Sequence, residues 1–147
     1  MLISEDQIYL NASYKYRDEV LKFISSEAEK IDAAQDKEIV FQDFVQRENE
    51  YSTAFQEGIA IPHAKSKAVK EAKLFFVRLQ NSIDWNSPNN FKVKVVFAIL
   101  VPEAESGTKH IQILSNLAGN LLEEEFQEQV FNAKDKQSIL ELLKTME

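Results

Sequence analysis

The sequence predicts one α/β domain, a mixed sheet of about four to five strands sandwiched between helices. Three observations favour this class. Apolar residues recur at helical spacing towards both ends of the chain, the middle holds two long apolar runs rich in β-branched residues, and turn residues separate those runs. With 147 residues, of which 44% are hydrophobic and 28% charged, the chain is long enough for one core, so residues 1–147 are expected to form a single domain.

Two helices are expected first. From Tyr14 to about Ala33, apolar residues fall at helical spacing with charged residues between them, which predicts a one-sided amphipathic helix. A second helix is expected over 36–48. Its apolar face is formed by Val40, Phe41, Phe44 and Val45.

Strands are expected in the middle of the chain. Residues 59–61 form a short apolar run, and Pro62 biases Ile61 towards extended geometry, so a brief strand should end beside His63. The runs 74–79 and 93–101 predict two longer strands. The second is apolar at successive positions from 95 to 101, as expected for a strand that is covered on both faces.

Turn and capping residues complete the pattern. Residues 87–90, Ser-Pro-Asn-Asn, predict a turn between the two long strands. Thr108 is expected to cap a helix that extends to about Leu121. Two further helices are expected over 124–131 and 135–145, with Asp135 as the cap of the second.

The composition excludes several kinds of function. The absence of cysteine removes disulfides, thiol nucleophiles and Cys-ligated metals, and the three glycines cannot form a G-x-G-x-x-G or Walker A loop. A net charge of −7 argues against nucleic-acid binding. No apolar run approaches the roughly 20 residues that span a bilayer, and the first residues lack the basic region of a signal peptide. We therefore expect a cytoplasmic protein.

The charge is divided into blocks along the chain. Residues 1–58 carry a net charge of −7, residues 59–100 of +5 and residues 101–147 of −5. The basic block follows His63 with Lys65, Lys67, Lys70 and Lys73. It is either a solvated loop and helix face or a collar that attracts an anionic group or an acidic partner near His63.

Few residues remain that could carry chemistry. His63 follows a strand, where sites often lie, and His110 is expected in the first turn of a helix, whose N–H groups favour anions and disfavour an imidazolium. Taken alone, each is more often a structural histidine. Arg47, near the end of the second helix, is either a solvated helix end or a guanidinium that grips a phosphoryl group. Ser52 and Thr53 are turn residues or hydroxyl donors to the same group.

These residues form a pattern that resembles the enzyme IIA component of the sugar phosphotransferase system (PTS), mannitol/fructose class, the EIIA type-2 domain. The segments that carry the resemblance are Arg47-Glu48, Ser52-Thr53, Gly58-Ile59-Ala60-Ile61-Pro62-His63-Ala64-Lys65, Phe76-Val77-Arg78-Leu79, Ile83-Asp84-Trp85, the strand 96–102 and the second histidine segment 110–118. Nearly the whole chain is covered. The resemblance implies the mannitol/fructose-type IIA fold and the activity of a protein-histidine phosphotransferase.

The resemblance also implies a relay. His63 would accept a phosphoryl group from the phosphohistidine of the phosphocarrier protein HPr, as tele-phosphohistidine, and pass it to a cysteine of the IIB component. IIB would in turn phosphorylate sugar that enters through the IIC membrane channel. His110 would donate a hydrogen bond to the phosphoryl group, Arg47 would neutralise its charge, and Thr53 or Ser52 would hold an oxygen or orient the His63 ring. No metal or other cofactor is implied, and the domain would work in the cytoplasm, docked to the membrane only through IIB and IIC.

Two departures and two alternatives stay open. Family members often have Ser-Thr-Gly where this chain has Ser52-Thr53-Ala54, and an alanine loses access to positive φ, so the loop that carries Thr53 is expected to differ. A turn without Asp-Gly follows Trp85. The first alternative is a regulatory, nitrogen-type IIA relative; Lys65 favours the fructose-like sugar branch. The second is a module in which His63 and His110 hold a metal, which the charge of Arg47 would oppose.

Overall fold

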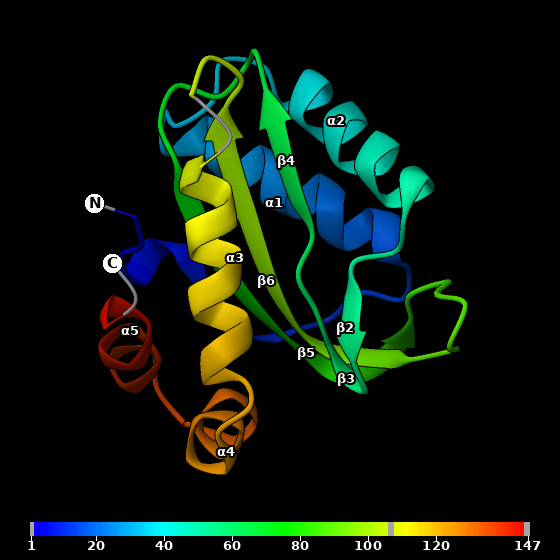
Figure 1. Ribbon diagram of the computed structural model, residues 1–147, viewed down its shortest axis with the longest axis vertical. Coiled ribbons are helices and arrows are strands. Elements are labelled where there is room, and N and C mark those ends of the chain that lie inside the picture. The colour runs from blue at the N-terminus through cyan, green and yellow to red at the C-terminus, as the bar shows by residue number, and fades with distance from the viewer. Residues whose placement is uncertain (1, 106–107, 146–147) are drawn as a thin grey trace.

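The computed structural model describes residues 2–105 and 108–145, and within them the chain forms a mixed sheet between two helical layers (Figure 1). The helices are η1 (Glu5–Gln7), α1 (Arg17–Lys30), α2 (Lys37–Glu50), α3 (Thr108–Asn120), α4 (Glu124–Asn132) and α5 (Lys136–Lys144). The strands are β1 (Ile8–Ala12), β2 (Ala54–Gln56), β3 (Gly58–Ala60), β4 (His63–Ser66), β5 (Lys73–Asp84) and β6 (Lys92–Pro102). The predicted fold class is confirmed. No helix in the described part of the chain is long and apolar enough to cross a membrane.

The sheet has six strands in the described ranges, in the order β1-β5-β6-β3-β2, and β4 also pairs with β6. The prediction of about four to five was therefore low. The missed strands β1, β2 and β4 have only three to five residues, too few to show a strand period. β1 pairs parallel to β5, and β5 pairs antiparallel to β6, while β3 and β4 both run parallel to β6 along successive parts of its length.

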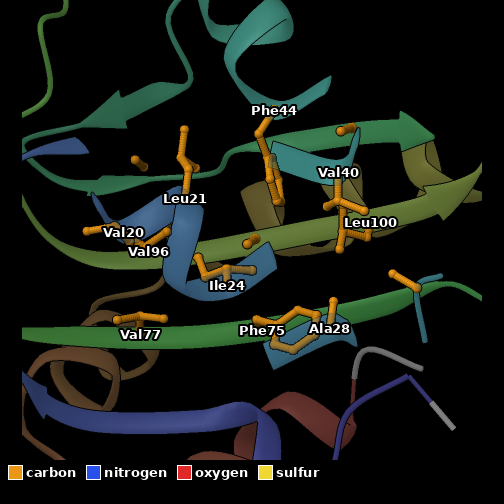
Figure 2. Packing of buried hydrophobic residues seen from close by; sticks show 14 of the residues in the cluster. Val20, Leu21, Ile24, Ala28, Val40, Phe44, Phe75, Val77, Val96 and Leu100 are labelled. Carbon is orange, nitrogen blue, oxygen red and sulfur yellow. The ribbon is translucent and has the colours of Figure 1, made fainter. Parts of the chain in front are cut away.

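The two long strands bury alternate residues in two cores. On β6, Val95, Phe97, Ile99 and Val101 face the layer of α3, α4 and α5, whereas Val96, Ala98 and Leu100 face α1 and α2. Figure 2 shows the second core, in which Leu21 and Ile24 of α1 and Phe44 of α2 pack over Phe75 of β5. Because successive strand residues point to opposite faces, a run of apolar residues fits a strand that is covered on both sides. The expectation for residues 95–101 is confirmed.

The helix boundaries follow from capping groups. α1 begins at Arg17 and not near Tyr14, because the Glu19 carboxylate accepts the N–H groups of Lys15 and Tyr16 at 2.9 and 3.1 Å. Asp135 caps α5 by accepting the Ser138 N–H at 2.8 Å, as predicted. α3 begins at Thr108 itself; the residues just before it, 106–107, lie outside the described part of the chain.

The turn between the long strands also forms where it was predicted. The Asn90 N–H donates to the Ser87 carbonyl at 3.0 Å, and the Phe91 N–H donates to the Ser87 hydroxyl at 3.0 Å. Asn86 and Asn90 adopt positive φ, a conformation that asparagine tolerates better than most residues. This turn lies beside the pocket that contains His63.

Candidate functional site

His63 lies at a break in the sheet. β3 ends at Ala60 and pairing with β6 resumes at His63, the first residue of β4, which is in register with Ile99. Pro62 has no N–H to donate to the ladder, but its carbonyl still accepts the Ile99 N–H at 2.9 Å. The predicted strand over 59–61 thus ends one residue earlier, and His63 is held by sheet pairing on a half-buried rim.

Both nitrogens of the His63 ring have partners. Nδ1 lies 2.9 Å from the carbonyl oxygen of Ile61, which can only accept, so Nδ1 carries the proton. Nε2 accepts the Nε–H of Arg47 at 3.1 Å, which requires an unprotonated Nε2. The two bonds agree on one neutral tautomer, whose free electron pair is on Nε2.

Arg47 reaches His63 from the last turn of α2, which packs against β4. Its Nη1 donates to the Tyr51 carbonyl at 2.7 Å while its Nε donates to His63. One guanidinium therefore connects the loop after α2 to the ring. The alternative of a solvated helix end does not describe this arrangement.

His110 approaches from the first turn of α3, 47 positions further along the chain. The centroids of the His63 and His110 rings are 6.1 Å apart, and the ring planes differ by 28°. The Nδ1 atom of His110 is buried and has no hydrogen-bond partner among the described residues. Sequence spacing could not bring the two histidines together; the layer of α3 over β6 does so (Figure 1).

The environment disfavours the protonated form of both rings. Burial lowers the pKa of His63, and the nearby charges of Arg47 and His110 lower it further, against the raising effect of the bond to Ile61. Burial also lowers the pKa of His110, followed by the charges of Lys65 and Arg47. From the sequence, only the start of the helix suggested a neutral His110. Burial and the surrounding cations are further causes that the structure adds.

Ser52 and Thr53 line the same pocket as Arg47 and His63. The Ser52 hydroxyl accepts the Ala54 N–H at 3.2 Å. The Thr53 hydroxyl donates to the carboxylate of Glu48, which also accepts the Thr53 N–H at 3.1 Å. Ala54 begins β2 and pairs with Ala60, so the residue that follows Thr53 is part of a strand.

Glu48 and Trp85 are parts of the site that their residue types and spacing did not single out. Glu48 is only 5% exposed, Trp85 is fully buried, and the indole N–H donates to Glu48 Oε1 at 3.4 Å. A signal for Glu48 was present. Val40, Phe44 and Glu48 are spaced four apart on one helix stripe, and a carboxylate in a buried stripe requires partners.

Two hollows meet at His63 and Arg47. The larger, of about 990 Å³, extends between the loop after α2, the turn after Trp85 and the apolar side of α3. The smaller, of about 290 Å³, is bordered by charged groups, among them Lys65 and Glu50, and by His110. The site thus offers a nucleophilic nitrogen, a guanidinium and a second imidazole around open space.

A metal ion does not suit this arrangement. Arg47 directs an N–H of its cationic guanidinium at the one His63 nitrogen that could bind a metal. In the ranges 2–105 and 108–145, no group of three or more His, Cys, Asp or Glu side chains gathers around a common point. An anionic, tetrahedral group fits the donors better, because guanidinium and imidazole N–H groups bind phosphoryl oxygens.

Comparison with known proteins places these residues in a family. The model of the phosphoenolpyruvate-dependent sugar phosphotransferase system, EIIA 2, matches residues 1–146. A fructose-specific PTS EIIA component of Haloferax volcanii is 36% identical over 108 residues, which are 74% of this chain and 70% of that protein. The chain spans 17–22% of the length of several multidomain relatives, among them the fructose-specific EIIABC component of Bacillus subtilis.

Solved structures share the fold. The nitrogen regulatory protein IIA-Ntr from Neisseria meningitidis superposes with a TM-score of 0.88 at 24% identity, over 95% of this chain and 94% of that one. IIA mannitol from Escherichia coli, in complex with phosphorylated IIB mannitol, gives 0.82 at 21% identity, over 97% of each chain. With the match to the family model over nearly its whole length, the chain belongs to the EIIA type-2 family of the phosphoenolpyruvate-dependent sugar phosphotransferase system, a phosphotransferase family of phosphocarriers.

Proposed function

We propose that residues 1–147 act as one EIIA type-2 domain that carries a phosphoryl group on Nε2 of His63. The observation that carries this proposal is the pair of bonds on the ring, Nδ1–H to the Ile61 carbonyl and Arg47 Nε–H to Nε2. They leave the nucleophilic electron pair on Nε2 and put a cation at the place where a phosphoryl group would arrive. Family membership supports the same role.

When His63 accepts a phosphoryl group, phosphorus replaces the Arg47 N–H as the partner of Nε2. As the Nε2 pair forms a bond to phosphorus, the P–N bond of the donor phosphohistidine breaks, and its electron pair returns to the donor nitrogen. The Nδ1 proton stays hydrogen-bonded to the Ile61 carbonyl throughout. Arg47 cannot keep its bond to Nε2, 3.1 Å away, once phosphorus occupies that space, so its N–H groups transfer to the phosphoryl oxygens.

His110 and Arg47 would stabilise the charge of the transferring group. Phosphoryl transfer through a loose transition state needs mainly positioning and electrostatic stabilisation. The His110 ring, 6.1 Å from His63 between centroids, is close enough to donate to an oxygen of a group on Nε2. We assign Ser52 and Thr53 to the wall of the pocket, where Thr53 acts through Glu48.

We propose HPr as the donor and a IIB cysteine as the acceptor, with sugar uptake through IIC as the outcome. The IIB assignment is supported by the mannitol IIA–IIB complex, which has the same fold, and by relatives in which IIA, B and C are fused. The fructose-specific Haloferax relative favours a fructose-like sugar. The exposed side chains Tyr51, Phe55 and Ile111 around the larger hollow provide an apolar rim on which such partners can dock in the cytoplasm.

A second function has its own support. The likeness to IIA-Ntr and a 28% identity to a nitrogen regulatory protein over 97% of this chain favour a regulatory branch, in which the phosphorylation state controls partner proteins. The chemistry on His63 would be the same. The branches differ in whether the phosphoryl group passes on to a IIB cysteine.

The proposal is tested by phosphorylation with phosphoenolpyruvate, enzyme I and HPr, followed by intact mass and peptide mapping. We expect one acid-labile, alkali-stable phosphoryl group on His63, and none on His63→Gln, with the fold of the variant checked by circular dichroism. A His63→Gln protein that still gains the group would refute the assignment. Addition of a fructose-type IIB domain then separates the branches, because only the sugar branch should lose its phosphoryl group to the cysteine.

A further inference from the structure

A continuous set of hydrogen bonds leads from a buried carboxylate to the His63 ring. The Glu48 carboxylate accepts three donors: the Thr53 N–H at 3.1 Å, the Thr53 hydroxyl and the Trp85 indole N–H at 3.4 Å. The Thr53 carbonyl accepts the Ile61 N–H at 2.9 Å. The Ile61 carbonyl in turn accepts the Nδ1–H of His63 at 2.9 Å.

Arg47 connects the other end of this set of hydrogen bonds back to α2. Glu48 follows Arg47 on the last turn of α2, and Arg47 returns to His63 at Nε2 and to the Tyr51 carbonyl. Residues at the end of α2 therefore influence both nitrogens of the His63 ring. Arg47 holds Nε2 directly, and Glu48 holds Nδ1 through Thr53 and Ile61.

Burial of the Glu48 carboxylate costs free energy that a purely structural role would not require. At 5% exposure it loses its hydration, and apolar residues occupy the two preceding positions of its stripe, Val40 and Phe44. An apolar side chain there would give the helix its packing without a buried charge. A carboxylate with three donors instead fixes where Thr53 and Trp85 lie relative to the helix end.

We propose that Glu48 is a positioning residue for phosphoryl transfer, acting through Thr53 and Ile61 to hold the His63 ring with Nδ1 protonated and Nε2 free. The effect on catalysis rests on the proposed function; the effect on the ring does not. Thr53 belongs to the same set of hydrogen bonds, so its hydroxyl helps to position His63 without contacting the phosphoryl group. Trp85 makes the third contact from the end of β5.

Glutamine at position 48 is the informative change. Glu48→Gln keeps the shape but replaces an acceptor oxygen by an NH₂ donor, which faces donors from Thr53 or Trp85. We expect Ile61 to shift and the Nδ1–H bond to weaken. Phosphoryl acceptance should fall by roughly tenfold or more, because a displacement of about 1 Å can cost up to about a hundredfold.

Two readouts separate positioning from stability. Nitrogen chemical shifts of His63, from long-range ¹H–¹⁵N correlation spectra, report which ring nitrogen carries the proton, and phosphorylation kinetics well below the melting temperature report transfer. Ser25→Ala is the matched control, since it removes a buried hydroxyl that donates to Leu21 in α1, away from the site. We expect Ser25→Ala to leave both readouts unchanged.

If Glu48→Gln does not fold, variants of Thr53 test the same proposal. Thr53→Val replaces the hydroxyl that donates to Glu48 with a methyl group of similar size, so it should move the nitrogen shifts and slow transfer. Thr53→Ser keeps the hydroxyl and should leave both close to wild type. Wild-type shifts and rates in Glu48→Gln or in Thr53→Val would overturn the positioning role. If wild-type His63 accepts no phosphoryl group but the variants still shift its nitrogens, the proposed function fails, while the effect of Glu48 on the His63 ring stands.

Discussion

The arginine at the site provides the sharpest quantitative prediction. Arg47 uses two nitrogens at once, Nε to His63 Nε2 at 3.1 Å and Nη1 to the Tyr51 carbonyl at 2.7 Å. A lysine at position 47 keeps the charge but has a single nitrogen, so it cannot make both bonds or present two parallel donors to a phosphoryl group. The Arg47→Lys variant should therefore keep the fold but transfer the phosphoryl group more slowly than wild type.

The size of the effect follows from the number of bonds lost. A hydrogen bond to a charged group is worth about 1.5–3 kcal/mol, and each 1.36 kcal/mol is about a factor of ten in rate. Loss of one such bond in the transition state predicts a rate about ten- to a hundredfold lower. A loss nearer a thousandfold would indicate that the second bond is lost as well.

The assay is the rate at which phosphorylated HPr transfers its phosphoryl group, followed by rapid quench and intact mass. Arg17→Lys is the matched control, because Arg17 pairs through Nε with Asp18 at 2.9 Å on α1 and does not line either hollow at His63. We expect the control to transfer at the wild-type rate. Arg47→Lys at the wild-type rate would refute the role of a two-nitrogen grip.

Three further predictions concern the second histidine, the pH dependence and the strand before the site. His110→Ala should keep the fold and transfer about ten- to a hundredfold more slowly, while His110→Gln, which keeps a donor, should lose less; equal rates in both and in wild type would exclude a stabilising bond from His110. Because burial lowers the pKa of His63, the unfolded chain binds a proton at this residue more readily than the folded chain does. The free energy of unfolding should thus decrease as the pH falls from 7.5 to 5.5, by urea denaturation, and His63→Gln should flatten this dependence; a wild-type slope in that variant would contradict the shift. Gly58→Ala should lower the free energy of unfolding by about 1–2 kcal/mol or more, since Gly58 has φ +92° and an added Cβ would lie 2.9 Å from Phe131 Cζ, whereas Gly119→Ala, with open space around it, should not destabilise the protein.

The sequence predicted the presence of every long element, although β5 continues to Asp84, well past the predicted end at 79. The helical segments before position 50 and the apolar run from 95 to 101 each contain several repeats of their period. Their secondary structure was therefore predictable without knowledge of tertiary contacts. The short strands β1, β2 and β4 had no such signal. They form because a neighbouring strand offers backbone partners, and such pairing depends on contacts that are distant along the chain.

The site was predictable only in part for the same reason. His63, His110 and Arg47 could be proposed from their residue types and from a family resemblance, but their approach to one another depends on α2 and α3 packing at β4 and β6. No role was assigned to Glu48 from the sequence, although its place on the apolar stripe of α2 marked it. A charged residue in line with two apolar ones on a helix is a signal that the sequence alone contains.

Our main proposal is that Nε2 of His63 is the phosphoryl acceptor, and spectra of the phosphorylated protein can decide it. After reaction with phosphoenolpyruvate, enzyme I and HPr, ³¹P–¹H and ¹H–¹⁵N correlation spectra identify the ring nitrogen that is bonded to phosphorus. We expect a single phosphorylated histidine, His63, with phosphorus on Nε2 and the proton retained on Nδ1. Phosphorus on Nδ1 of His63, on His110, or on neither histidine while HPr phosphorylates a control acceptor, would show that the proposal is wrong.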